Sequence, residues 1–519
     1  MGAFEKVHAG SLSALGMRVA FFSDYPEGLG EQMRVLVFGM LVSIVVGPEA
    51  ALCQGPVCFV DPNLRSAVER ELGVAGPAAT DMLNLTELNA YGRGITDLAG
   101  LEYAENLRRL NLQYNRITDI SPLLNLRCLI YLDLRQNQIP DISALLRLTN
   151  LRRLDLEQVN RYGEPIRGVG ALAGLTELEY LRLADNPFGD ISPLDGLGSL
   201  KTLILEYNEI RDISALSNLT GLRQLTIDRN PVADIASLKG LTNLTHLDLG
   251  HNQVTDINAL SNLTKLRQLT LWINRIKDIS ALSGLTNLKG LHLGLNQITD
   301  VSPLSGLTEL THLALFNNRI SDILALNQMK RLTWLNLNNN RICDISALSE
   351  MTELKCLRLS VNQIEDISAV SGLTNLVQLT LAHNRITNIS PVSDLDNLQG
   401  LDLRGNKISD ISALCRLTKL GHLHLDGNPL DACAYYFYLP LVLRNNRRLA
   451  DLQWQPNPYL VVDEWGWELA DAATFVECFG QSGCCENDDW CDGADMDRSG
   501  TVDDNDVAQF AWYLAKAAQ

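Results

Sequence analysis

The sequence predicts an α/β solenoid, a coil of short units in which each turn adds one strand to a curved parallel sheet. Three observations predict this fold class. Similar 22-residue units follow one another along most of the chain, an asparagine returns at that same period from Asn186 to Asn428, and the units share the alternating pattern L-x-x-L-x-L. A globular fold of unique topology would not keep that register, whereas a solenoid requires it.

The first element along the chain is an apolar segment that predicts export. Residues 34–51, RVLVFGMLVSIVVGPEAA, contain an apolar core of thirteen residues at 35–47. A membrane-spanning helix needs about 20 residues, and a basic residue before the core with small residues after it is typical of a signal peptide. We therefore assign residues 1–58 to an N-terminal extension with a signal peptide and expect translation to start at Met33. The alternative is an internal hydrophobic segment of a cytosolic protein.

Sixteen units occupy residues 85–430, opened by leucines at 85, 107, 129, 151, 178 and 200 and then at the constant 22-residue period to 420. In each strand the leucines point inward and the residues between them outward. We expect the asparagines to stack in a ladder inside the turn, where their amides satisfy backbone groups. In the returning ITDIS segment, aspartate and serine are expected to cap a short helical turn. Aspartate fills that column thirteen times, from Asp97 to Asp410.

One unit is longer than the others. This unit, at 151–177, has 27 residues instead of 22, because EQVNRYGEPIRGV at 157–169 replaces the usual turn. Extra residues on a solenoid bulge out as a loop, which either binds a partner or is simply tolerated.

The units resemble the leucine-rich repeat family, in the 22-residue subclass shared by bacterial internalins and a eukaryotic phosphatase regulator. FVDPNLRSAVERELG at 59–73 resembles the helical cap of internalin-like proteins, so residues 59–84 are assigned to an N-terminal cap that covers the leucines of the first coil. The apolar stretch up to Asn446 is assigned to a closing helix within a C-terminal cap at 431–452. The resemblance implies a curved horseshoe whose concave parallel sheet, about 75 Å long, binds another macromolecule.

Charge and motifs exclude several classes of function. The net charge is −18, which argues against nucleic acid or an anionic membrane as the main partner, because both require a basic surface. The sequence has no nucleophile elbow, P-loop or zinc-binding helix motif, and we expect no enzymatic activity and no catalytic residues. The core at 35–47 is too short for an integral membrane protein.

The outward strand positions are the third, fifth and seventh of each unit, with the eighth at the rim. The first units are charged there, as at Arg135 and Asp155, whereas five successive middle units carry aromatic rings. We predict the ligand-binding residues of the concave face to be His246, Trp272, His292, His312, Phe316 and Trp334, because large aromatics that face solvent are typical of interaction hot spots. Gly290, Gly294 and Ala314 are expected to leave room among them. The alternative is a set of exposed positions without a role. A metal site formed by His292 and His312 is a weaker alternative, because no acidic residue completes it.

A different composition begins after the repeats. Residues 453–468 are predicted to be a linker, and residues 469–519 contain DMDRSGTVDDND, in which acidic side chains alternate around Gly500. This is the spacing of a calcium loop, and its predicted ligands are Asp495, Asp497, Ser499, Thr501 through its carbonyl, Asp503 through water, and Asp506. With the apolar helix that follows, the segment resembles a dockerin, which implies a small helical module, calcium as cofactor and a cohesin-like partner. Only one acidic loop is present where dockerins carry two.

Together these features predict a secreted or cell-surface binding protein whose partner is a protein or, alternatively, a glycan, with the tail as a tether. We expect a monomer. Two other functions stay open: a structural or assembly spacer whose tail docks to a cohesin-like partner, and an intracellular scaffold like the phosphatase regulator. The cysteines of the tail are expected to form disulfides, with a zinc site as the alternative.

Overall fold

The computed structural model describes residues 55–159, 166–431, 433–434, 438–446, 449 and 451–453. The predicted signal peptide, most of the linker and the predicted calcium-binding module lie outside these residues. The chain divides into two units, Met1–Pro56 and Val57–Gln519, and the repeats belong to the second.

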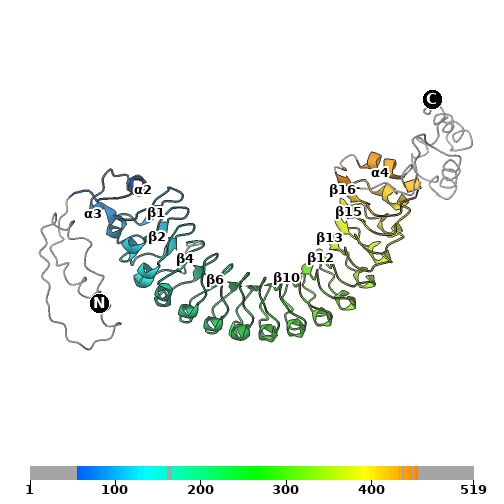
Figure 1. The fold of residues 1–519 in the computed structure, drawn as a ribbon, viewed down its shortest axis with the longest axis horizontal. Helices are drawn as coiled ribbons and strands as arrows, with labels where there is room; N and C mark the ends of the chain where they lie inside the picture. Colours follow the sequence, from blue (N-terminus) through cyan, green and yellow to red (C-terminus); the bar gives the residue numbers. More distant parts are fainter. Residues whose placement is uncertain are drawn as a thin grey trace, which may run out of the picture. The chain divides into compact units, whose positions relative to one another are not determined.

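The repeats form one parallel sheet that lines the inner side of an arc (Figure 1). The strands are β1 (Glu87–Asn89), β2 (Arg109–Asn111), β3 (Tyr131–Asp133), β4 (Arg153–Asp155), β5 (Tyr180–Arg182), β6 (Thr202–Ile204), β7 (Gln224–Thr226), β8 (His246–Asp248), β9 (Gln268–Thr270), β10 (Gly290–His292), β11 (His312–Ala314), β12 (Trp334–Asn336), β13 (Cys356–Arg358), β14 (Gln378–Thr380), β15 (Gly400–Asp402), β16 (His422–His424) and β17 (Asp451–Gln453). Each strand pairs in parallel with the next strand along the chain. Leu247 of β8 faces Leu269 of β9, so the register aligns equivalent residues.

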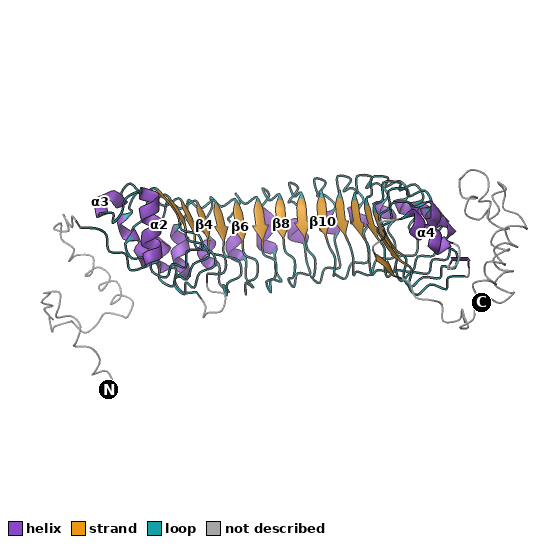
Figure 2. Ribbon diagram, turned by 90° about the horizontal axis from the view of Figure 1, so that it is seen from above, coloured by secondary structure: helices purple, strands orange, loops and turns teal. Residues whose placement is uncertain are grey.

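The outer side of the arc is built from short 3-10 helices. They are η1 (Leu101–Tyr103), η2 (Ser121–Leu123), η3 (Ser143–Arg147), η4 (Val169–Gly174), η5 (Ser192–Leu194), η6 (Ser214–Leu216), η7 (Ala236–Gly240), η8 (Asn258–Leu260), η9 (Ser280–Leu282), η10 (Ser302–Leu304), η11 (Leu324–Leu326), η12 (Ser346–Leu348), η13 (Ser368–Val370), η14 (Ser390–Val392) and η15 (Ser412–Arg416). Seen from above, the strands run side by side like rungs, one to each coil (Figure 2). The predicted horseshoe is thus confirmed.

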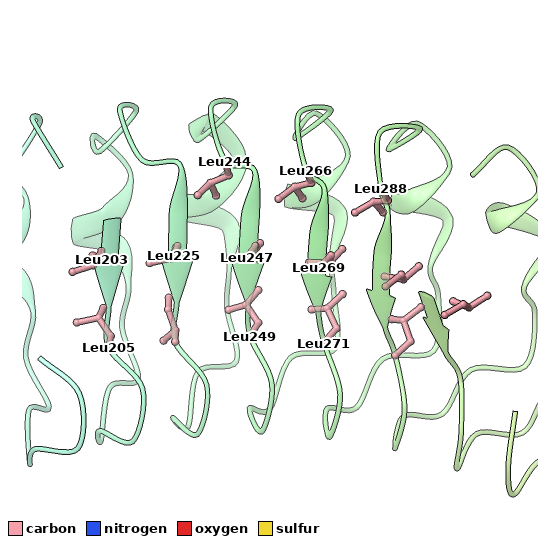
Figure 3. Packing of buried hydrophobic residues seen from close by; sticks show 14 of the residues in the cluster. Leu203, Leu205, Leu225, Leu244, Leu247, Leu249, Leu266, Leu269, Leu271 and Leu288 are labelled. Atoms are coloured by element: carbon pink, nitrogen blue, oxygen red, sulfur yellow. The ribbon is translucent and has the colours of Figure 1, made fainter. Parts of the chain in front are cut away.

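The core is a set of leucine rows that run along the arc. Leu244, Leu247 and Leu249 come from one coil, and each is at most 2% exposed. Equivalent leucines of the neighbouring coils lie beside them (Figure 3). Each coil is too thin to bury its leucines alone, so the core exists only because the coils stack.

The asparagine ladder is present. The amide of Asn252 donates to the carbonyls of Leu249 (3.1 Å) in its own coil and Ile227 (3.0 Å) in the preceding coil, and its oxygen accepts the N–H of Val232 (3.1 Å). The residue before it, His251, has φ 47°, a left-handed conformation that is costly for a residue with a Cβ. The buried amide therefore joins successive coils and stabilises a strained turn.

The ladder is interrupted in the expanded unit, where Val159 takes the asparagine's place. Val159 is fully buried, and its backbone carbonyl accepts the N–H of Ile139 (2.6 Å) that an asparagine oxygen would otherwise accept. Residues 160–165 are not described. After them, Arg167 forms an isolated parallel bridge with Asp141, so the chain returns to the regular coil at once.

The aspartate column caps the 3-10 helices, with a small shift from the expected position. Asp256 Oδ1 accepts the N–H of Asn258 (2.8 Å), the first residue of η8, and the residue at the N-cap position itself is Ile257. The aspartate thus forms a side-chain turn onto the first residue of the helix from one residue before the N-cap position.

Helices cover the two ends of the leucine core. At the start, α2 (Pro62–Leu72) packs Leu64, Ala67 and Val68 into it, followed by α3 (Ala79–Met82). At the end lies α4 (Leu439–Asn445). Beyond α4, β17 pairs with β16 and adds a strand that was not predicted from the sequence. None of the helices described is long and apolar enough to cross a membrane.

Candidate binding surface on the concave sheet

The six predicted ligand-binding residues lie on or directly after five adjacent strands, β8 to β12, at outward positions. His246, His292 and His312 are exposed, and Trp272, Phe316 and Trp334 are partly buried. We call these six residues the aromatic patch. Their exposure alternates with buried leucines, such as Leu291 beside His292, so the side chains stand on the concave face.

Rings of the patch pack in two groups, which also include His251 and Arg358 from outside the six residues. The rings of His292 and Trp334 lie with their centroids 6.3 Å apart, tilted by 33°, and the Arg358 guanidinium lies 5.7 Å from the Trp334 ring. In the other group, the His251 and Trp272 rings lie nearly perpendicular, at 86°, with their centroids 4.5 Å apart. The contacts of Trp334 with His292 and Arg358 hold that ring in place before any partner arrives, which lowers the entropy cost of binding.

Gly290 and Gly294 do not leave room for a ligand, contrary to the expectation from the sequence. A Cβ on Gly294 would collide with the Phe316 ring, and one on Gly290 would collide with the Gln268 amide, because these side chains lie directly over the glycines. Trp272 lies over Gly250 in the same way. The expected space is therefore filled by side chains of the next or previous coil, and the glycines allow the rings to lie close to the sheet.

The histidine pair does not form a metal site with a third ligand. His292 and His312 lie on neighbouring strands, and partial desolvation of the ring together with the nearby His312 lowers the pKa of His292. In the part of the chain that the structure describes, no group of three histidine, cysteine, aspartate or glutamate side chains could hold a metal ion. The predicted calcium ligands, Asp495 to Asp506, lie outside that part.

Towards the N-terminus the concave face carries a network of ion pairs. Arg135 contacts Asp133 (2.8 Å) and Asp155 (3.3 Å), and these two carboxylates are 1% and 2% exposed. Arg182 bridges Glu157 (2.9 Å) and Glu206 (3.0 Å). Burial raises the pKa of Asp155 to about 6, although Arg135 opposes the shift. The arginines of this network are therefore already paired with carboxylates of the same face.

A second feature of this region was not predicted from the sequence. At the third position of successive units, Arg109 lies 4.8 Å from the Tyr131 ring and Arg153 lies 3.6 Å from the Tyr180 ring. Over four successive units this column holds Arg109, Tyr131, Arg153 and Tyr180, an alternation that is a visible signal for cation–π contacts between adjacent strands.

The fold and the aromatic patch together define the class of protein. It is a solenoid whose curved sheet has an open concave side with aromatic side chains on it. Comparison with known families then gives the family. A profile described as leucine rich repeats in two copies matches residues 105–147, 198–240, 242–284, 264–306, 286–328, 308–350 and 352–395, and one described as leucine rich repeat matches residues 374–430. The chain belongs to the leucine-rich repeat family.

Solved structures agree with this assignment. An internalin (inlF) from Listeria monocytogenes is 36% identical, with 68% of this chain and 98% of that chain covered and a TM-score of 0.57. The ectodomain of the Arabidopsis receptor kinase HAESA, solved with a peptide hormone ligand, is 25% identical over 64% of this chain and 60% of that chain, with a TM-score of 0.55. A Leptospira interrogans leucine-rich repeat protein shares the fold at 22% identity, with 72% and 97% covered and a TM-score of 0.56. Among curated proteins no relative matches.

This fold is typical of protein-binding proteins, among them bacterial internalins and plant receptor ectodomains, and such proteins are generally not enzymes.

Proposed function

We propose that the chain is an exported, non-enzymatic binding protein that recognises a protein ligand on the aromatic patch. The observation that carries the proposal is the gathering of exposed and half-buried rings on five adjacent strands of an open sheet. Tryptophan and phenylalanine supply large contact area at little entropy cost, and tryptophan is enriched in binding hot spots. The peptide hormone complex of HAESA supports a protein or peptide as ligand rather than a glycan.

The proposal is tested by capturing partners from cell-surface extracts on the immobilised full chain. Trp334→Ala, alone and combined with Phe316→Ala, is expected to weaken capture by at least tenfold, because truncation of a hot-spot residue costs about 2 kcal/mol or more.

The matched control is Leu324→Ala on η11, an apolar side chain on the outer side of the arc that is 61% exposed. Its capture should equal that of the unmodified chain. Undiminished capture by the concave variants, or an equal loss in the Leu324 variant, would refute binding at the aromatic patch.

For the tail we propose calcium binding by Asp495, Asp497, Ser499, Thr501, Asp503 and Asp506, and for residues 35–47 a cleaved export signal. The proposals rest on the acidic spacing around Gly500 and on the length of the apolar core. Calorimetry of the full chain with calcium should give binding heat that Asp495→Ala removes, whereas Asp256→Ala on the arc should leave it unchanged. Absence of heat in the unmodified chain would end the calcium proposal, and an uncut N-terminus in mass spectra of the mature protein would end the export proposal.

A further inference from the structure

The concave face carries three carboxylates on successive coils directly beside the aromatic patch, and one of them has no ion pair with a described residue. On β6 to β8 and the residues that follow them, the outward positions hold three carboxylates, Glu206, Asp228 and Asp248, and no lysine or arginine. Arg182 pairs with Glu206 from the preceding coil, and Arg229 pairs with Asp228 from the rim at 3.3 Å. Asp248 accepts the N–H of Gly250 (2.9 Å) and has no ion pair with any residue that the structure describes.

A second observation at the same place concerns hydrogen bonds that are not made. Asp228 Oδ1 and His251 Nε2 are both buried and have no hydrogen-bond partner among the described residues. Asp228 Oδ1 and the Trp272 indole approach the same point above Gly250, and the His251 ring lies nearly perpendicular to that indole, with the ring centroids 4.5 Å apart. A buried polar atom without a partner costs about 1–3 kcal/mol, so the Asp228 carboxylate has unused capacity to accept a hydrogen bond.

These groups share one chemical complement. Carboxylates accept hydrogen bonds, and the face of an indole attracts cations. A guanidinium group meets both requirements, because it is planar, always charged, rich in donors and stacks on aromatic rings. The nearby arginines of the arc, Arg182 and Arg229, are held in their own ion pairs.

We propose that the concave face between β7 and β9 is the docking surface for a basic peptide segment, whose arginine side chain stacks on Trp272 and pairs with Asp248 and Asp228. This inference rests on the proposed function and names the chemistry of the ligand: a segment with an arginine next to apolar side chains. The arginine neutralises the carboxylates while the apolar side chains contact Phe316 and Trp334. Rotation of the indole away from Gly250 gives the guanidinium access to Asp228 Oδ1.

The test uses a library of random dodecapeptides displayed on phage and selected on the full chain. Selected peptides are expected to carry an arginine at a constant spacing from an apolar residue. In calorimetry, changing that arginine to glutamine should weaken binding at least tenfold. With the Asp228→Asn/Asp248→Asn double variant, the same change in the peptide should have no further effect, as a double-mutant cycle requires for directly interacting groups.

The control is Asp256→Asn, which neutralises a carboxylate of the outer aspartate column and should keep the full effect of the arginine. The double variant removes repulsion between buried carboxylates, so it is expected to fold, and its circular dichroism spectrum checks this. Peptides that lose binding with Trp334→Ala but are indifferent to their arginine would overturn the inference and leave the proposed function standing. Failure of any peptide to be selected, or selection unaffected by Trp334→Ala, would overturn both.

Discussion

Individual asparagines do more for this fold than their small size suggests. Asn384 donates to the carbonyls of Leu359 (3.0 Å) and Leu381 (2.9 Å) and accepts from the N–H of Ile364 (3.1 Å), while it is only 8% exposed. When the side chain is removed, these buried backbone groups cannot form hydrogen bonds with water instead. Replacing such an asparagine therefore lowers the stability of the fold mainly because desolvated backbone groups lose their partner. The net contribution of a single hydrogen bond is smaller than this loss.

Asn384→Ala is expected to destabilise the arc by about 3 kcal/mol, because at least two buried backbone groups lose their partner. Urea unfolding followed by circular dichroism measures the loss. The control is Asn375→Ala, an exposed asparagine with one hydrogen bond to the Thr352 carbonyl (2.9 Å), which should change stability by less than about 0.5 kcal/mol. Equal effects of the two changes would contradict the role given to the ladder.

Among the elements, the terminal helix α2 is attached through one buried carboxylate. Asp61 accepts the N–H groups of Asn63 (2.8 Å) and Leu64 (3.1 Å) at the helix start, and the N–H of Thr96 (2.7 Å) in the first coil. Burial alone would raise the pKa of Asp61, but these hydrogen bonds outweigh it and hold the pKa below its ordinary value. One side chain thus caps the helix and fixes it against the repeats.

Asp61→Ala is expected to cost about 2 kcal/mol, since it removes a helix cap and leaves the Thr96 N–H without its acceptor. Because α2 covers the first leucines, amide hydrogen exchange should accelerate in α2 and around β1 and much less at β10. Asp119→Ala, which removes an exposed carboxylate from the turn before η2, is the comparison. Unchanged exchange in α2 would show that apolar packing alone holds the helix.

Elements differ in how far the sequence could predict them. The leucine and asparagine columns predicted every strand from β1 to β16. The period fixes both the register between strands and the side of the sheet on which each side chain lies. The strand β17 was missed although its signal exists: Leu449 and Leu452 have the spacing of the first and fourth positions of a unit. The packing of Trp272 over Gly250 could not be predicted from columns, because it depends on side-chain rotamers and on a neighbour in the adjacent coil. The outward placement of the six residues of the aromatic patch could therefore be predicted from the sequence, but the packing of their rings could not.

At the scale of the whole molecule, buried carboxylates make stability depend on pH. Burial raises the pKa of Asp248 to about 6, with Asp228 and Glu206 adding to the shift, and burial likewise raises that of Asp155 to about 6. In the unfolded chain such groups titrate near a pKa of about 3.9. Between about pH 4 and 6 the folded state therefore binds more protons, and stability falls as the pH rises through this range.

The arc is accordingly expected to be more stable at about pH 5 than at about pH 7.5, measured by the midpoint of urea unfolding. Asp248→Asn should raise the midpoint at the higher pH and change it little near pH 4, so that the dependence on pH becomes weaker. Below about pH 4 stability should fall again, since carboxylates with a lowered pKa, such as Asp61 and Asp212, become protonated. A variant with the same pH dependence as the unmodified chain would exclude Asp248 as the source.

The direction of the asparagine hydrogen bonds has a consequence for how the chain can change length during evolution. Each ladder amide takes its partners from its own coil and the coil before it, and the register between strands is the same from one coil to the next. Excising one exact unit from the gene would bring two equivalent coils together and remake every such bond. The arc can therefore lose or gain one whole coil without disturbing the ladder, while extra residues outside the strands, as in the unit at 151–177, leave the register between Leu154 and Leu181 intact. Inserting or removing one coil would therefore change the binding surface while keeping the fold.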